Sequence, residues 1–460
     1  MREVAARPAK KEDPVDMRDR VFLIGAIVLV AGVVGYLAHR HYAEEEALRE
    51  QEAAARKVAA TGCLSGHYEL TRKVARTRID ACTRALAPGT SSDDKLPPDQ
   101  VAHLHGARAV ARLAAGDTQG AASDAQIALT HFDKEAAAGT PAPESLARRA
   151  VALHVAGDTK GALATYDAAV EAAPQDPTLL YRRGVLRMTS PGDYSGAIQD
   201  FNAALTLSPD NLDVLIRRGD AYGRAGDAQK SIADLDRAVW LNLESAPAHL
   251  YRGIERARLG QYGPAQEDFA TALALDPDNT DALINRAAIF LTERDPAKAL
   301  ADLDRATELE PASPLAFYNR GYAQFLLRRY DDALQSYSRA IEFNSQFAMA
   351  YENRCLVEAI LGRNLAAARA DCDKALALQP KAASVHQTRG FLFLKLADPK
   401  QAIAEYDEVL AQDPNSALAL FGRGLARVKL GDTAAGESDK QAAATIDPEV
   451  ADQFTRYGVD

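Results

Sequence analysis

Few residues in this sequence have the types and spacing that enzyme or metal chemistry requires. Ser92 and Lys95 have the S-x-x-K spacing of some hydrolases, but they lie in a segment rich in Ser, Asp and Pro without a companion motif. His103 and His105 carry imidazoles that can bind metals, yet residues two apart on a helix point to different faces. The segment 276–279 (DPDN) lacks the glycine and distal glutamate of a calcium loop. The sequence therefore predicts no catalytic residue, no metal site and no cofactor, and it indicates that the protein is not an enzyme.

An arginine recurs along most of the chain, and an acid follows most of its copies at a nearly fixed distance. The arginines are Arg108, Arg149, Arg183, Arg218, Arg252, Arg286, Arg320, Arg354, Arg389 and Arg423. The acids are Asp124, Asp200, Asp234, Asp268, Asp302, Asp371, Glu405 and Asp439. A row of arginines could bind anionic ligands, but the matched acids favour ion pairs between neighbouring helices. We therefore expect these arginines to hold the structure together.

These positions belong to a repeat of about 34 residues. Each copy reads as two short amphipathic helices. A small residue follows the arginine, as in Gly184, and is expected to let the second helix approach closely through its own alanine, such as Ala197. A proline closes most copies, and the Asp, Asn or Ser after it is expected to open the next helix. The closing prolines are Pro174, Pro209, Pro277, Pro311, Pro380, Pro414 and Pro448.

The period and the order of small, aromatic and proline residues resemble the tetratricopeptide repeat family. One copy shows the pattern in Gly184, Ala197, Phe201, Ala204 and Pro209. The resemblance covers residues 99–448 and implies an all-α fold, a right-handed solenoid of about ten helical hairpins. The recurrent arginine departs from the family pattern, in which its position is often leucine.

Two parts of the array are irregular. Residues 131–144 contain Gly139, Pro141 and Pro143 and are predicted to form a loose loop. The last second helix, 433–445, is polar, and residues 449–460 are interpreted as a C-terminal tail or cap.

The four cysteines form two local pairs. Cys355 and Cys372 occupy the small and the aromatic positions of one repeat, which the resemblance places opposite each other across a hairpin. The sequence around Cys82 parallels that around Cys372, so residues 60–98 are interpreted as a degenerate leading hairpin and linker with a Cys63–Cys82 pair. Two disulfides would indicate an oxidising compartment, most simply a bacterial periplasm, whereas four buried thiols are the alternative.

Residues 21–38 carry no charge, and as a helix they would span roughly 27 Å, close to the hydrocarbon thickness of a membrane. A cleaved signal peptide is the alternative, but a cut after Ala38 would place the bulky Tyr36 close to the cleavage site. Six Lys and Arg residues lie in the arm before this segment and four lie over a similar length after it, which favours a cytoplasmic N-terminus. We expect a basic cytoplasmic arm (1–20), a transmembrane helix (21–38) and a helical stalk (39–59). The protein would then cross the bacterial inner membrane once, with its repeats in the periplasm.

The resemblance also implies that the first helices of successive repeats line a concave groove. The middle repeats place a mixed set there: Tyr181, Asp213, Asp220 and Arg224. The later repeats place an apolar and aromatic set there: Leu315, Tyr318, Tyr322, Phe325, Met349, Leu356, Phe391, Leu394, Phe421 and Leu425. Large exposed apolar groups usually mark a binding surface, and packing between adjacent first helices is the alternative.

Together these features predict a membrane-anchored scaffold or adaptor that binds other proteins or peptide segments in its groove. The net charge of -10 argues against a nucleic-acid partner, and no small-molecule substrate is expected. Two alternatives remain. One is a platform that faces the cytoplasm, and the other is a structural spacer or homo-oligomer whose groove is filled by the chain itself or by another copy.

Overall fold

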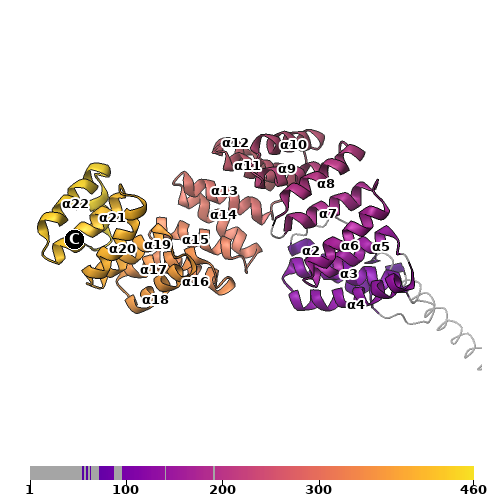
Figure 1. Cartoon of the computed structure of the whole chain (residues 1–460), viewed down its shortest axis with the longest axis horizontal. Coiled ribbons are helices and arrows are strands. Elements are labelled where there is room, and N and C mark those ends of the chain that lie inside the picture. Colours follow the sequence, from indigo (N-terminus) through magenta and orange to yellow (C-terminus); the bar gives the residue numbers. More distant parts are fainter. Residues whose placement is uncertain are drawn as a thin grey trace, which may run out of the picture. The chain divides into compact units, whose positions relative to one another are not determined.

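The computed structural model describes residues 54–55, 59–60, 63, 72–87, 96–139, 141–189 and 192–459. Every regular element in these ranges is an α-helix (Figure 1). The expected cytoplasmic arm and transmembrane helix, most of the stalk, and Ser92 and Lys95 lie outside the described residues. In the described part of the chain, no helix has both the length and the apolar character needed to cross a bilayer.

The chain divides into two compact units, Met1–Gln175 and Asp176–Asp460. The helices of the first unit are α2 (Arg72–Ala85), α3 (Pro98–Ala115), α4 (Thr118–Ala138), α5 (Pro143–Val155) and α6 (Thr159–Ala172). The second unit begins with α7 (Pro177–Thr189), α8 (Tyr194–Leu207), α9 (Leu212–Arg224), α10 (Ala228–Leu241), α11 (Ala246–Arg258), α12 (Tyr262–Leu275), α13 (Thr280–Thr292) and α14 (Pro296–Leu309). It continues with α15 (Pro314–Leu326), α16 (Tyr330–Phe343), α17 (Ala348–Leu361), α18 (Leu365–Leu378), α19 (Ala383–Lys395), α20 (Pro399–Gln412), α21 (Ala417–Lys429), α22 (Thr433–Ile446) and α23 (Val450–Arg456).

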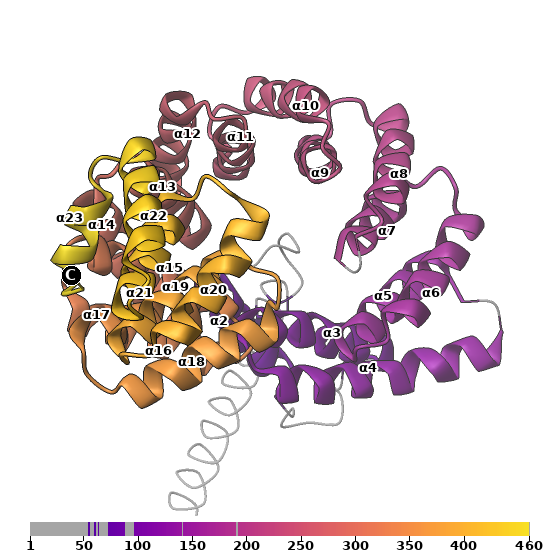
Figure 2. The same ribbon diagram turned by 60° about the vertical axis from the view of Figure 1, so that its left-hand side comes forward.

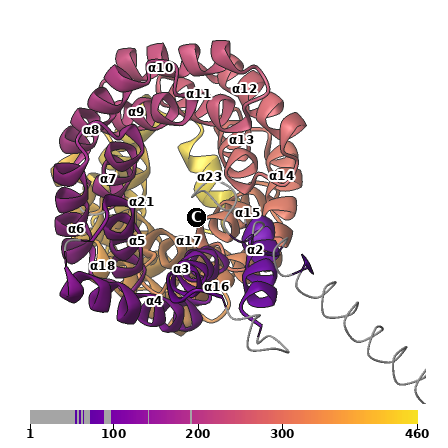
Figure 3. The same ribbon diagram turned by 90° about the vertical axis from the view of Figure 1, so that its right-hand side faces the viewer.

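The helices pack in consecutive pairs, from α3 with α4 to α21 with α22, and each pair is one hairpin of the repeat. The predicted all-helical array of hairpins is therefore confirmed for the described residues. Within each unit, the first helix of a hairpin also contacts the first helix of the next, as α15 contacts α17 and α17 contacts α19. Because first helices pack on first helices, they form the inner side of the second unit (Figure 3).

Side chains that accept hydrogen bonds from the first turn begin most helices. Aspartates cap the second helices of seven hairpins, because a carboxylate oxygen accepts a bond from a backbone N–H that has no partner inside the helix. These aspartates are Asp117, Asp158, Asp193, Asp227, Asp295, Asp398 and Asp432. The expected Asn and Ser caps of the first helices are present at Asn211, Ser245, Asn279, Ser313 and Ser416.

The predicted loose loop at residues 131–144 is wrong over most of its length. Helix α4 continues to Ala138, and only residues 139–142 separate it from α5. The inserted residues His131–Ala138 include Lys134, Glu135 and three alanines, which favour helix. The chain leaves the helix only at Gly139, where the Gly and Pro residues begin.

The core of each hairpin lies where the small residue of the first helix faces the second helix. A Cβ on Gly184 would come within 2.6 Å of the Phe201 ring, so this glycine makes room for the ring of the second helix. The sequence predicts that Ala197 makes the close contact with Gly184, whereas the atoms nearest to a Cβ on Gly184 belong to Phe201. Phe201, Phe269, Tyr337 and Tyr406 are fully buried at this position.

Candidate partner-binding groove

The recurrent arginines form the predicted ion pairs in the hairpins that carry the matched acid. In each of these eight hairpins a guanidinium nitrogen lies 2.6–2.8 Å from a carboxylate oxygen of the second helix. The pairs are Arg108–Asp124, Arg183–Asp200, Arg218–Asp234, Arg252–Asp268, Arg286–Asp302, Arg354–Asp371, Arg389–Glu405 and Arg423–Asp439. The arginines are therefore structural and do not form a ladder for anionic ligands.

The two hairpins without the acid use a hydroxyl instead. Arg149 donates to Thr165 Oγ1 at 3.2 Å, and Arg320 donates to Ser336 Oγ at 3.1 Å. Several of these arginines also bind an acid on the preceding hairpin, as Arg252 does with Asp236 at 2.9 Å. The same side chain thus joins the two helices of one hairpin and connects that hairpin to its predecessor.

Asp124 shows how such a buried carboxylate stays charged. Burial would raise its pKa, but hydrogen bonds from His105 and Arg108, together with the charges of Arg108 and Arg112, hold the pKa well below its usual range. His105 Nδ1 lies 2.7 Å from Asp124 Oδ1, so this imidazole has a structural partner. No cluster of three or more His, Cys, Asp or Glu suited to a metal ion exists among the described residues.

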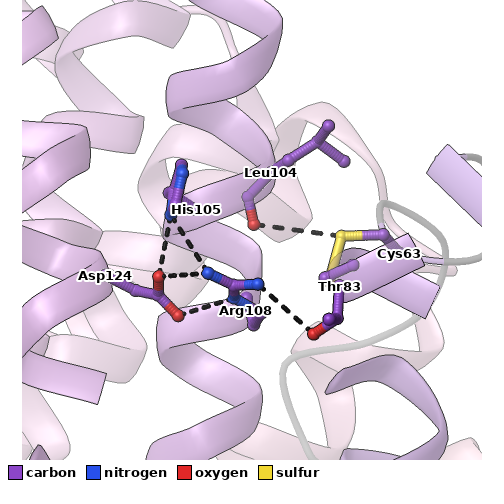
Figure 4. The surroundings of a disulfide bond; sticks show 7 residues. Cys63, Thr83, Leu104, His105, Arg108 and Asp124 are labelled. Carbon is purple, nitrogen blue, oxygen red and sulfur yellow. Dashed lines mark hydrogen bonds and ion pairs between the residues drawn. A yellow bond between two sulfur atoms is a disulfide. The ribbon is translucent and has the colours of Figure 1, made fainter. Parts of the chain in front are cut away.

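Both expected cysteine pairs are disulfides, Cys63–Cys82 and Cys355–Cys372. Figure 4 shows the first, where Cys63 Sγ lies 3.9 Å from the carbonyl oxygen of Leu104. A disulfide sulfur has no hydrogen to donate, so this is a packing contact. Arg108 on α3 also donates to Thr83 Oγ1 on α2 at 3.3 Å. Packing and the Arg108–Thr83 hydrogen bond thereby attach the leading segment to the first complete hairpin.

The apolar groove residues of α15 and α17 are accessible. Leu315 is 49% exposed, Tyr322 is 37% exposed and Met349 is also exposed. Tyr318, Phe325 and Leu356 are half-buried. Tyr322 and Phe325 lie with nearly parallel rings, 6.4 Å apart between centroids. This part of the first-helix surface, Leu315, Tyr318, Tyr322, Phe325, Met349 and Leu356, is named the open face.

The equivalent residues of α19 and α21 are covered. Phe391, Leu394, Phe421 and Leu425 are each less than 8% exposed. They share one apolar cluster with Val450, Phe454 and Val459 of the C-terminal segment. The Phe454 ring lies 5.1 Å from Phe421 and 6.1 Å from Phe391 between centroids. This part, Phe391, Leu394, Phe421 and Leu425, is named the covered face.

The covering element is α23, which packs beside α22 at the C-terminal end (Figure 2) and lies inside the curve of the second unit's helices in the end-on view (Figure 3). Lys395 Nζ on α19 donates to the carbonyl oxygens of Tyr457 at 3.0 Å and Gly458 at 3.4 Å. The sequence predicts a tail or cap at residues 449–460 and not a helix that contacts the groove. The signal was present, since Val450, Phe454 and Tyr457 have the i, i+4, i+7 spacing of one helical face.

A cleft of about 150 Å³ remains where the open face meets α23. Phe325, Leu356 and Phe391 line it from the first helices, and Phe454 and Tyr457 line it from the C-terminal segment. Tyr406 also contributes to its wall, and the buried hydroxyl of this tyrosine has no hydrogen-bond partner among the described residues. Burial raises the pKa of Tyr406 far above its usual value, so the hydroxyl keeps its proton. The cleft therefore has largely aromatic walls, and Gln387, Thr388 and Gln453 are also among its lining residues.

Family models decide what kind of array this is. One tetratricopeptide repeat model matches residues 107–177, 191–249, 250–314 and 389–451, which is more than half of the chain, and another matches residues 314–347. The chain belongs to the tetratricopeptide repeat family.

Solved structures resemble this tetratricopeptide protein at low sequence identity, and no curated protein matches its sequence. A tetratricopeptide repeat protein from Parabacteroides merdae is 20% identical, covers 54% of this chain and 98% of its own, and has a TM-score of 0.41. PilW, a type IV pilus biogenesis factor, is 20% identical, covers 45% of this chain and 96% of its own, and has a TM-score of 0.42. The human IFIT1 dimer with PPP-AAAA is 15% identical, covers 79% and 96%, and has a TM-score of 0.47. At these TM-scores the neighbours do not bear on what this chain binds.

The middle of this tetratricopeptide array has a different inner surface. Arg224 Nε lies 2.8 Å from Asp220 Oδ1, and Arg217 Nη1 donates to the Tyr251 hydroxyl at 3.0 Å. Because these charged groups bind one another, they are less available to a ligand than the apolar residues of α15 and α17. The open face is therefore the best candidate for partner binding.

Proposed function

We propose that this protein is a membrane-anchored scaffold that binds segments of other proteins along the inner side of its later hairpins. The observation that carries this proposal is the open face, where large apolar side chains stay accessible on two adjacent first helices. Monomeric soluble surfaces seldom leave such a contiguous apolar patch without a partner.

The proposal includes an oxidising location. The uncharged segment 21–38 would anchor the protein in the inner membrane, and the flanking charges favour repeats in the periplasm. Two disulfides support this side of the membrane, because cytosolic thiols are usually kept reduced. Alkylation of denatured protein from intact cells tests it. Cysteines that react only after reduction support the periplasm, and cysteines that react at once would move the search to the cytoplasm.

Site-specific photo-crosslinking in cells tests partner binding. A photoreactive residue in place of Met349 reports on the open face, and one in place of Trp240, which is 76% exposed, is the control position. We expect Tyr322→Ser with Phe325→Ser to abolish the adducts formed from position 349 and to leave those from position 240 unchanged. Trp240→Ser with Leu243→Ser is the matched control, since it removes two exposed apolar groups elsewhere. Unchanged adducts from position 349 would refute the proposed site.

A structural spacer is the second candidate, and α23 is the observation that favours it. A spacer was expected to fill its own groove, and the chain does cover the inner side of α19 and α21. A spacer would tolerate the double substitution of Tyr322 and Phe325 without losing any crosslink. The same experiment therefore separates the two functions.

A further inference from the structure

We propose that α23 occupies, in cis, part of the site for a partner segment, and that the partner is an amphipathic helix with two aromatic residues one turn apart. This proposal rests on the proposed function and names the chemistry of the ligand. The C-terminal segment shows that chemistry directly, because Phe454 of α23 and Tyr457, the residue after this helix, place two rings on Phe391 with centroids 6.1 and 6.0 Å away.

Helix α23 is suited to leave its site. It has seven residues, and no side chain caps its N-terminus. Helices shorter than about 12–15 residues are marginal in water, so α23 is helical because it is docked. Such short docked segments open locally without unfolding the elements that they cover.

The site also fits α23 incompletely. The cleft of about 150 Å³ lies between the aromatic residues of α23 and the residues Phe325 and Leu356 of the open face. An interior that is well packed leaves little such space, because each gap loses dispersion contacts. A partner with a larger apolar side chain would fill the cleft and regain those contacts.

The two faces then become one continuous binding surface. The open face receives the partner first, since its side chains are accessible while α23 is docked. The partner then extends across the cleft, takes the place of Phe454 and Tyr457 on Phe391 and Phe421, and offers its backbone carbonyls to Lys395. Its apparent affinity is reduced by the fraction of molecules in which α23 is docked.

Competition by the chain's own segment tests the proposal. The probe is a fluorescent peptide with the sequence of residues 449–459, and the host is the full-length protein in detergent. We expect the host with Phe454→Ser and Tyr457→Ser to bind the probe about tenfold more tightly than the unmodified protein, because its site is vacant for a larger fraction of the time. The host with Trp240→Ser and Leu243→Ser should bind like the unmodified protein. A probe with serine at both aromatic positions should not bind.

Two results would overturn the proposal. The first is equal binding of the probe to the unmodified host and to the host with Phe454→Ser and Tyr457→Ser, called the opened host. The second is an opened host that keeps α19–α22 folded but binds no probe. An opened host that forms dimers and binds no probe counts as this second result. Hydrogen exchange of the unmodified protein decides the matter even if the opened host unfolds. The amides of α23 should exchange by local opening while those of α21 stay protected, and equal protection would refute displacement. The scaffold function is tested separately. If the α23 proposal fails, loss of the position-349 crosslinks on substitution of Tyr322 and Phe325 still supports the scaffold function.

Discussion

The open face and the covered face occupy the same positions of successive repeats but differ in their exposure. Tyr322 on α15 is 37% exposed, whereas Phe391, at the same repeat position of α19, is 6% exposed. Both are aromatic, and both follow the structural arginine and the small residue. The difference arises from the C-terminal segment, in which Phe454 of α23 and the following Tyr457 pack on Phe391. Repeat position thus determines which side a residue faces, and a separate segment determines whether that side is accessible.

The largest expected contrast comes from truncating one aromatic residue on each face. Phe421→Ala removes a buried ring that packs on Phe454, and it should lower the free energy of unfolding by about 3–5 kcal/mol. Tyr322→Ala removes a partly exposed ring, and its effect should stay within about 0.5 kcal/mol. Urea unfolding measures both effects, and hydrogen exchange should localise the loss in Phe421→Ala to α19–α22. Similar losses for the two variants would mean that the faces do not differ in packing.

The next largest contrast concerns the partner of the recurrent arginine, which is an acid on α22 and a hydroxyl on α16. Asp439 on α22 accepts from Arg423 and Arg427, with distances of 2.8 and 2.7 Å, so Asp439→Asn should lower the free energy of unfolding by about 3 kcal/mol. On α16 the corresponding residue is Ser336, which lies between Arg320 and Gln324. Ser336→Ala should lower the same quantity by about 1 kcal/mol. An unchanged free energy of unfolding in the Asp439→Asn variant would show that the ion pair adds nothing to stability.

Reduction should weaken the hairpin that contributes Met349 and Leu356 to the open face. Cys355 and Cys372 are separated by 17 residues, and closing a loop of that length stabilises a fold by about 3 kcal/mol in the chain-entropy model. We expect reductant to lower the stability of α17 and α18, measured by hydrogen exchange. The variant with Cys355→Ala and Cys372→Ala is the control, and reductant should not destabilise these helices in it. A further loss in this control would assign the effect to another cause.

The smallest expected effects concern two buried hydroxyls, one near each face. Neither Tyr337 on α16 nor Tyr406 on α20 has a hydrogen-bond partner for its hydroxyl among the described residues. Replacing each by Phe removes an unsatisfied polar group and should raise the free energy of unfolding by up to about 1 kcal/mol. Thermal unfolding measures the change in each variant, and a clear loss of stability in either variant would show that its hydroxyl does have a hydrogen-bond partner.

The periodic features were predictable because each depends on residues close in sequence. The pairing of Arg423 with Asp439 follows from two positions of one hairpin that recur along the chain. The disulfide of Cys355 with Cys372 follows from the same hairpin geometry. Residues 131–138 were predicted wrongly because the nearby Gly and Pro residues were given more weight than the helix propensity of the insertion.

Helix α23 was missed because its signal is short. Val450, Phe454 and Tyr457 span only two turns, and they do not follow the period of the array. A segment of this length is not stable as an isolated helix, so local propensity gives little information about it. Its structure depends on contacts with Phe391 and Phe421, which are remote in sequence.

The sequence by itself determined the repeat, the helix pairs, the cysteine pairs and the arginine–acid contacts, since all of these are set within one hairpin or between neighbours. Only the tertiary structure decided which apolar residues of the groove remain accessible. That outcome depends on where a short C-terminal helix finds enough apolar surface to bury its own aromatic residues. The chain therefore carries two similar faces, and the docking of α23 makes one of them core and leaves the other exposed.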